Sequence, residues 1–192
     1  RYIFEKYQPQ TVLDIGCGVG GYLSYLKTLG VQDVFGVDGI PPDATVLTPG
    51  EYGQVDLQLP LDLGRSFDLV MCIEVVEHLE PETTDVALET IARHARDLIV
   101  FSMGEPGQPG NGHINCRDMS DVLERWAKLG WHPVLTDTLG ARAISTLSWL
   151  RRNIVVLQRG GALPDQGIAR DLLCEISQMR YQWYSQPSGL RL

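Results

Sequence analysis

The chain has 192 residues, of which 44% are hydrophobic, and a formal net charge of −8 at pH 7. This length suits one full-sized core and is too short for two domains of ordinary size. The acidic balance argues against broad, non-specific binding to a nucleic-acid backbone, which requires a basic surface.

The cysteines and the apolar segments indicate a cytoplasmic location. The four cysteines are widely spaced and form no C-x-x-C pair, which is typical of reduced thiols in the cytoplasm. No apolar run approaches the roughly 18 residues of a membrane span. The N-terminus also lacks the charged-then-apolar pattern of a signal peptide. We therefore expect a soluble chain without a membrane span.

Apolar, β-branched runs alternate with segments of helical periodicity along most of the chain. Strands are predicted at residues 11–15, 34–38, 54–56, 67–73, 97–102, 131–138 and 153–157. Helices are predicted at residues 22–29, 81–94 and 120–129. This alternation predicts an α/β fold with a single doubly wound, mostly parallel seven-stranded sheet and helices on both faces. We place this domain at residues 1–160.

Residues 161–192 are expected to form a helical extension. Apolar side chains recur at helical spacing from Asp165 to Tyr184. Such a helix either packs back on its own domain, which is the commoner arrangement, or forms a homodimer contact. The sequence alone does not decide between these two arrangements.

The stretch VLDIGCGVGG, from Val12 to Gly21, joins the first predicted strand to the first predicted helix. Ligands of open α/β sheets bind at the carboxyl ends of the strands, so this turn lies at the expected site. Its glycines permit positive φ and leave no Cβ between backbone and ligand. Asp38 ends the second strand at a spacing that suits a carboxylate bound to the hydroxyls of a ribose. These features fit any adenosine-bearing cofactor, whether a dinucleotide such as NAD or a nucleoside.

The order of the motifs favours the nucleoside. The glycine loop, the acid-ended second strand and the run FDLVMCIEVVEHL at residues 67–79 together resemble class I S-adenosylmethionine-dependent methyltransferases. The resemblance covers roughly residues 11–159 by the order of the elements. It implies a Rossmann-like methyltransferase fold, S-adenosylmethionine as the cofactor and S-adenosylhomocysteine as its product. An NAD-dependent oxidoreductase would not need the motif EVVEHL.

The resemblance also assigns residues to the cofactor. The first motif would enclose the methionine part, an acid after the second strand would bind the ribose, and an acid after the third would lie beside the adenine. The end of the fourth strand would line the pocket near the reacting sulfonium. The residues so assigned are Asp14, Gly16, Cys17, Gly18, Gly20, Asp38, Gly39, Asp56, Leu57, Cys72, Ile73 and Glu74. The structural alternatives are a tight turn for the glycines, a helix cap for Asp38 and packing for Cys17.

Two histidines are candidate bases. Transfer of a methyl group to a hydroxyl requires that its proton be removed, whereas the sulfonium carries its own leaving group. His78 follows the fourth strand and His113 lies in the glycine-rich loop after the fifth, at the edge where ligands bind. We expect both, with Glu77, to be catalytic, because histidine transfers protons near neutral pH. Organisation of the loop below the cofactor is the alternative role for His78 and Glu77.

A metal-dependent reaction is a further alternative. Glu74, Glu77, His78 and His113 resemble the E-x-x-E-H plus distant histidine set that binds magnesium in the small-RNA 3′-terminal 2′-O-methyltransferases. Such a set would let Mg²⁺ polarise a hydroxyl pair. The histidine-rich, aromatic surroundings of the RNA enzymes' later motif are missing, and the acidic chain has no evident RNA-binding stripe. We therefore assign no metal ligand and keep methylation of RNA ends as the alternative.

The segments that select the acceptor in this family are short here. They correspond to residues 1–10, 103–117 and 139–153, and the last contains Trp149 among several arginines, which suits an anionic or sugar-bearing acceptor or a solvated rim. The sequence thus predicts methyl transfer, most simply to an oxygen of a small-molecule, sugar or lipid-linked acceptor, with no nucleic acid as partner. A non-catalytic cofactor-binding protein that interacts through its C-terminal helix is the alternative from another class.

Overall fold

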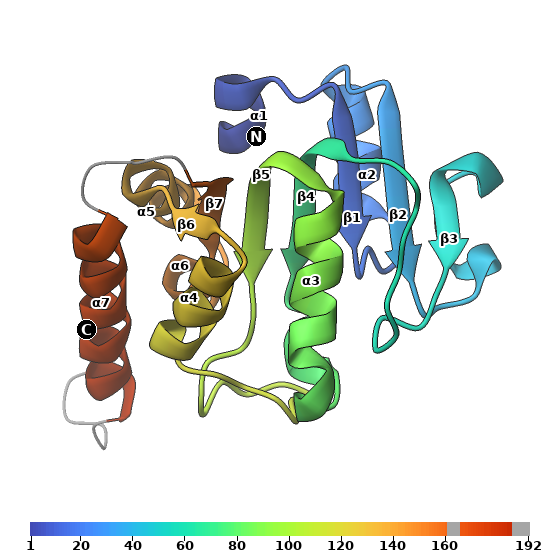
Figure 1. The fold of residues 1–192 in the computed structure, drawn as a ribbon. Helices are drawn as coiled ribbons and strands as arrows, with labels where there is room; N and C mark the ends of the chain where they lie inside the picture. Colours follow the sequence, from blue (N-terminus) through green and yellow to red (C-terminus); the bar gives the residue numbers. More distant parts are fainter. Residues whose placement is uncertain (161–165, 186–192) are drawn as a thin grey trace.

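Seven strands form one sheet in the order β3-β2-β1-β4-β5-β7-β6 (Figure 1). The computed structural model describes residues 1–160 and 166–185. Neighbouring strands from β3 to β5 are parallel, whereas β7 is antiparallel to β5 and β6. The strands are β1 (Thr11–Ile15), β2 (Asp33–Asp38), β3 (Tyr52–Gln54), β4 (Phe67–Ile73), β5 (Ala95–Ser102), β6 (Trp131–Pro133) and β7 (Val155–Arg159). The expected mostly parallel seven-stranded sheet is confirmed.

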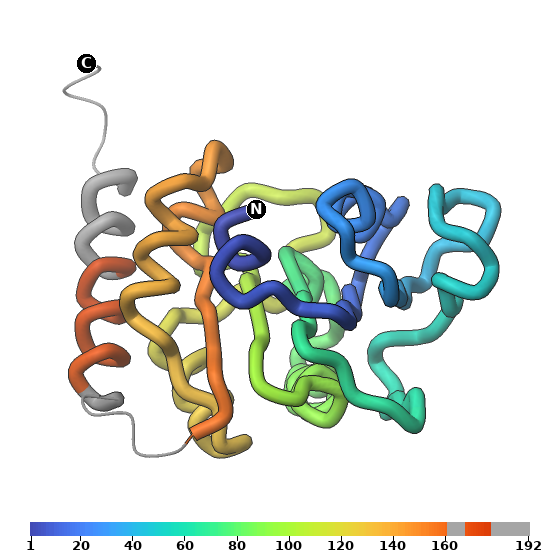
Figure 2. The backbone as a smooth tube through the Cα atoms, turned by 90° about the horizontal axis from the view of Figure 1, so that it is seen from above, coloured from blue at the N-terminus to red at the C-terminus, as the bar shows by residue number. Residues whose placement is uncertain are grey.

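Helices cover both faces of this sheet, and Figure 2 shows α2 and α3 on opposite sides of the strands. One face packs against α1 (Tyr2–Tyr7), α2 (Gly21–Thr28) and α5 (Leu135–Ile144). The other packs against α3 (Thr84–His94), α4 (Met119–Lys128) and α7 (Gln166–Ser185). A short helix, α6 (Leu150–Asn153), directly precedes β7. In the described ranges, no helix has the length and apolar content needed to cross a membrane.

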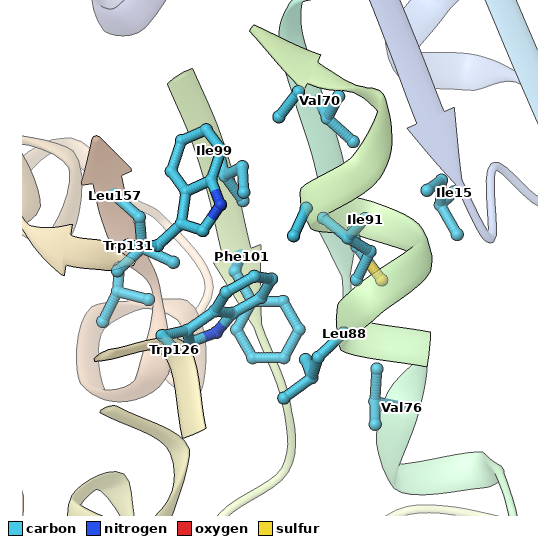
Figure 3. Packing of buried hydrophobic residues seen from close by; sticks show 14 of the residues in the cluster. Ile15, Val70, Val76, Leu88, Ile91, Ile99, Phe101, Trp126, Trp131 and Leu157 are labelled. Carbon is cyan, nitrogen blue, oxygen red and sulfur yellow. The ribbon is translucent and has the colours of Figure 1, made fainter. Parts of the chain in front are cut away.

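Alternation of side chains along the strands divides the core into two layers. In β5, Ile99 and Phe101 belong to the layer under α3 and α4, whereas Leu98 and Val100 belong to the layer under α2 and α5. Trp126 of α4 packs edge-on against Phe101 with ring centroids 5.2 Å apart (Figure 3). Near-continuous burial of both strand faces explains why the central strands are almost wholly apolar in sequence.

The strand predicted at residues 131–138 is wrong beyond Pro133. Residues Leu135–Ile144 instead form α5. β-Branched residues suggested a strand, but Thr138 and Ala141, three residues apart, are buried against the sheet as on one helical face. Thr138 also accepts a hydrogen bond through Oγ1 from the N–H of Val156 in β7, at 3.0 Å. Packing against β7 therefore outweighs the local preference of these residues for a strand.

The short helix α1 carries no prediction from the sequence, and one buried acid of α5 holds it in place. The Asp137 carboxylate is completely buried and accepts hydrogen bonds from Tyr2, Lys6 and Tyr7. Burial alone would raise the pKa of Asp137, but these hydrogen bonds outweigh it and lower the pKa. This cluster ties α1 to a residue of α5 that lies 130–135 positions away in the sequence.

Other boundaries also differ from the predictions. The last strand spans Val155–Arg159 rather than residues 153–157, because Asn153 ends α6. The third strand spans Tyr52–Gln54 rather than residues 54–56, because Asp56 accepts the N–H of Gln58 at 2.9 Å and so begins a turn. The C-terminal helix begins at Gln166, and its Leu173 is completely buried beside α4. Residues 161–165 and 186–192 of the expected extension lie outside the described residues. A homodimer through α7 stays a prediction.

Candidate active site

A cavity of about 660 Å³ lies at the carboxyl ends of four adjacent strands. In Figure 1 the arrowheads of β1 and β2 point toward this edge, whereas β7 points away from it. The lining comes from the segments that follow β1, β2, β3 and β4. It comprises Gly16, Asp38, Gly39, Gln54, Val55, Asp56, Leu57, Gln58, Glu74, Val75, His78 and Leu79. Seven of the residues that we predicted from the sequence are therefore brought together: Gly16, Asp38, Gly39, Asp56, Leu57, Glu74 and His78.

The glycine loop adopts the conformation that its sequence requires. Gly16, Gly18 and Gly20 have φ values of 78°, 52° and 83°, in the left-handed region. A Cβ on Gly16 would overlap the side chain of Val75, so this glycine lets the loop approach the segment after β4. A Cβ on Gly18 would meet no atom within 4 Å in the described structure. The backbone of Gly18 thus borders open space.

Asp38 links the end of β2 to the glycine loop. Its Oδ2 accepts the N–H of Gly18 at 2.7 Å, and its Oδ1 accepts the N–H of Ile40 at 3.1 Å. These bonds fix the carboxylate at the cavity wall, while each oxygen retains a lone pair for a ligand hydroxyl. One strand away, after β3, the exposed Asp56 lines the same cavity beside Leu57. This arrangement suits a nucleoside whose ribose lies beside Asp38 and whose adenine lies beside Asp56.

Several predicted cofactor residues lie outside the lining. Cys17 is buried, and its Sγ lies 2.7 Å from the position that a Cβ on Gly36 would take, so its side chain packs against β2. Cys72 is completely buried in the core, and Ile73 packs against the opposite layer. Asp14 is only 1% exposed. Burial, with a contribution from the charge of Asp38, raises the pKa of Asp14 to about 7.

Glu74 directly follows β4, and its carboxylate is held by two amides that no sequence motif singles out. Its φ of 57° is unusual for a non-glycine residue, and its N–H donates to Ser102 Oγ at 3.1 Å. Its Oε1 accepts from Asn153 Nδ2 at 2.8 Å, and its Oε2 accepts from Gln108 Nε2 at 2.6 Å. Asn153 ends α6, and Gln108 lies in the loop after β5. No local pattern marks either residue, because both contacts span large sequence separations.

The segment after Glu74 brings both predicted histidines together. The rings of His78 and His113 pack edge to face with centroids 4.9 Å apart. His78 lines the cavity, whereas His113 is half-buried behind it and lies outside the lining. The backbone carbonyl of Glu77 accepts the N–H groups of Ile114 and Asn115 at 2.9 and 3.0 Å. These bonds hold the His113 loop against the segment after β4.

Glu77 is completely buried beneath the histidines. Neither of its carboxylate oxygens has a hydrogen-bond partner in the described part of the chain. Burial, together with the nearby charge of Glu74, raises the pKa of Glu77 to about 8. Ligand atoms of Glu77, His78 and His113 all lie within 4.8 Å of one another, so these three side chains have a spacing suited to a metal ion. Glu74, the fourth residue of the E-x-x-E-H resemblance, is not among these three and accepts hydrogen bonds from the two amides.

The charge of the cavity limits the kind of ligand that it suits. Its described lining contains three carboxylates, from Asp38, Asp56 and Glu74, and neither lysine nor arginine. Such a wall disfavours a diphosphate and favours a ligand with positive charge. The spacing of four strands, roughly 14 Å from β3 to β4, suits an elongated molecule. These residues fit a sulfonium nucleoside better than a dinucleotide.

Comparisons with known proteins support this interpretation. The family model described as a methyltransferase domain matches residues 1–138. The sugar N-methyltransferase KedS8 from Streptoalloteichus sp ATCC 53650 has a TM-score of 0.64 and 21% identity, over 83% of this chain and 84% of that chain. Magnesium protoporphyrin IX methyltransferase (ChlM) from Synechocystis PCC 6803 with bound SAH has a TM-score of 0.61 and 19% identity, over 82% and 78% of the chains.

A third similar structure is the methyltransferase domain of bacterial CtHen1-C, with a TM-score of 0.58 and 16% identity over 83% of this chain and 94% of that chain. A search of curated protein sequences finds no match. The family model covers well over half of the chain and includes the glycine loop, Asp38 and the EVVEHL motif. The chain therefore belongs to the methyltransferase domain family and is a class I S-adenosylmethionine-dependent methyltransferase.

Proposed function

We propose that the enzyme transfers the methyl group of S-adenosylmethionine to an oxygen of a small-molecule or sugar acceptor. The observation that carries this proposal is the pair of imidazoles at the end of the cavity, where His78 lines the wall and His113 packs against its ring. The cofactor supplies the electrophilic methyl carbon and a neutral thioether leaving group. The protein must then orient the acceptor and remove one proton.

The cofactor would lie along the strand ends. Asp38 would accept hydrogen bonds from ribose hydroxyls, and Asp56 and Leu57 would border the adenine. Gly16 and Gly18 would let the backbone approach the methionine part. Glu74 would face the sulfonium end, because it follows β4 on the side of β1 opposite to Asp38.

The hydrogen bonds of the histidines favour His78 as the proton acceptor. His78 Nδ1 lies 3.2 Å from the carbonyl oxygen of Gly112, which can only accept, so Nδ1 carries the hydrogen in the neutral ring. Nε2 then has the lone pair that takes a proton from an acceptor hydroxyl. His113 has the same relation to the carbonyl oxygen of Gln108, at 3.2 Å. Its half-buried ring would hold that of His78 in place.

The short acceptor segments and the similarity to KedS8, a sugar N-methyltransferase, support a small or sugar-like acceptor. The test is turnover of labelled S-adenosylmethionine with panels of sugar nucleotides, glycolipid intermediates and phenols, followed by mass spectrometry to locate the new methyl group. We expect an O-methyl product, loss of turnover in His78→Ala and His113→Ala, and near-normal binding of S-adenosylhomocysteine in both variants. Methylation of nitrogen or carbon, or turnover by both variants at the wild-type rate, would contradict the proposal.

Cofactor binding is tested independently of the acceptor. Calorimetric titration with S-adenosylhomocysteine should show binding that Asp38→Ala weakens by at least about tenfold, the effect of losing charged hydrogen bonds. NAD⁺ should not bind. Binding without turnover across all acceptor panels would favour the non-catalytic alternative.

A second candidate activity, metal-dependent methylation of an RNA end, is favoured by one observation. Ligand atoms of Glu77, His78 and His113 place a carboxylate and two imidazoles within 4.8 Å of one another. These donors fit a divalent ion that would polarise a hydroxyl, although Mg²⁺ prefers an all-oxygen set. Titration with Mg²⁺ and Mn²⁺, and turnover of single-stranded RNA with and without chelator, test this activity. Equal turnover with chelator would exclude a metal-dependent step.

A further inference from the structure

The charge of the cofactor changes during the reaction that we propose. S-Adenosylmethionine carries a positive sulfonium, which becomes a neutral thioether in S-adenosylhomocysteine when its methyl group leaves. A protein charge near the sulfur therefore acts on the substrate form and much less on the product form. Of the three carboxylates in the described lining, Glu74 is the one that follows β4, farthest along the edge from β3.

Two neutral amides fix the Glu74 carboxylate. Asn153 Nδ2 lies 2.8 Å from Glu74 Oε1, 3.0 Å from the Met103 carbonyl oxygen and 3.2 Å from Gln108 Oε1. All three neighbours are acceptors, so the amide group can face them only with its nitrogen. Gln108 Nε2 completes the arrangement at 2.6 Å from Glu74 Oε2.

Because both partners are neutral, Glu74 keeps its negative charge. A lysine or arginine at the same place would offset the negative charge of Glu74, whereas an amide orients the carboxylate without neutralising it. Asn153 is 2% exposed, so its amide is shielded from water and is held in this contact. The reversed direction of β7 brings Asn153 to this edge, since Val155 pairs with Phe101 at the end of β5.

We propose that Asn153 and Gln108 are positioning residues that hold the Glu74 carboxylate toward the sulfonium, so that the enzyme binds S-adenosylmethionine in preference to S-adenosylhomocysteine. This inference rests on the proposed placement of the cofactor and not on the acceptor, the methylated atom or the histidine base. It assigns a role in product release to residues outside the glycine loop, because loss of the sulfonium charge removes the attraction.

The test is the ratio of the two dissociation constants, Kd for S-adenosylhomocysteine over Kd for S-adenosylmethionine, measured by calorimetry without any acceptor. Glu74→Gln should lower this ratio by roughly tenfold, and Asn153→Ala and Gln108→Ala by about threefold each. In the double variant Glu74→Gln/Asn153→Ala, the ratio should equal that of Glu74→Gln alone, because Asn153 acts through Glu74.

Asn115→Ala is the matched control. Asn115 is also a buried amide, 4% exposed, but it donates to the Val76 carbonyl oxygen and Thr84 Oγ1, at 3.1 and 2.8 Å. Its replacement should leave the ratio unchanged whatever its effect on stability. Gln108 is only half-buried, so Gln108→Ala carries the test if Asn153→Ala does not fold.

Equal weakening of both ligands by Glu74→Gln would overturn the proposal, because it would place the carboxylate near the amino group that both ligands share. An unchanged ratio in both Asn153→Ala and Gln108→Ala would overturn the positioning role. Failure of wild-type protein to bind either ligand would instead contradict the proposed cofactor placement as a whole.

Discussion

Asp14→Asn should stabilise the protein increasingly as the pH rises. Asp14 is 1% exposed in β1, and its Oδ2 has no hydrogen-bond partner in the described part of the chain. Burial, then the charge of Asp38, raises the pKa of Asp14 from 3.8 to about 7. The unfolded chain therefore releases this proton above pH 3.8, whereas the folded chain keeps it until about pH 7, so stability falls across that range. The free energy of unfolding therefore falls by about 4 kcal/mol in total, at about 1.36 kcal/mol per pH unit.

The assay is urea unfolding of the wild type and Asp14→Asn at pH 5, 6, 7 and 8, followed by circular dichroism. An asparagine has no proton to release, so the difference in free energy of unfolding should shift in favour of the variant by about 3 kcal/mol between pH 5 and pH 8. Asp137→Asn is the control, because the pKa of Asp137 is lowered and its ionisation is complete throughout this range. A difference for Asp14→Asn that stays constant from pH 5 to pH 8 would refute the reasoning.

Three further predictions concern the glycine loop, the hydrophobic core and the buried Asp137. Gly16→Ala should abolish binding of S-adenosylhomocysteine in calorimetry, because the residue has a φ of 78° and its Cβ would overlap Val75; Val75→Ala should not restore binding fully, since the strain at positive φ remains. Trp131→Ala should lower the free energy of unfolding by about 3–5 kcal/mol, as the indole is completely buried. Asp137→Asn should cost about 3 kcal/mol at neutral pH, and this cost should shrink as the pH falls through the lowered pKa of Asp137; urea unfolding at pH 7 and at a series of pH values below 3.8 measures the decrease.

The part of the site nearest the glycine loop could be predicted because its signals are local. An apolar run followed by spaced glycines predicts a strand, a tight turn and a helix, and Asp38 lies at the end of the next strand. Parallel strands then bring their carboxyl ends to one edge by topology alone. Contiguous sequence therefore predicts where the cavity lies and which acids border it.

The remaining features depend on contacts between distant segments. Asn153 lies 79 residues from Glu74, and its contact exists only because β7 is antiparallel and starts beside the end of β5. The helix α5 contains β-branched residues that locally favour a strand, and burial against β7 overrides them. Burial of Cys17 and Cys72 likewise depends on side-chain direction, which a motif assigns only to a position in the chain.

Because β7 runs in the reverse direction, the segment before it can change in evolution without changing the strands beside the proposed cofactor site. The chain re-enters the sheet at the ligand-binding edge, so residues 145–149, which are mostly exposed and precede α6, can change in length without altering any strand pairing. The family model ends at residue 138, before this segment begins. Insertions there would reshape the surface that we propose to meet the acceptor and leave the proposed nucleoside site intact, provided that an amide returns to the position of Asn153. A new substrate range is thus accessible through one surface segment rather than through the core.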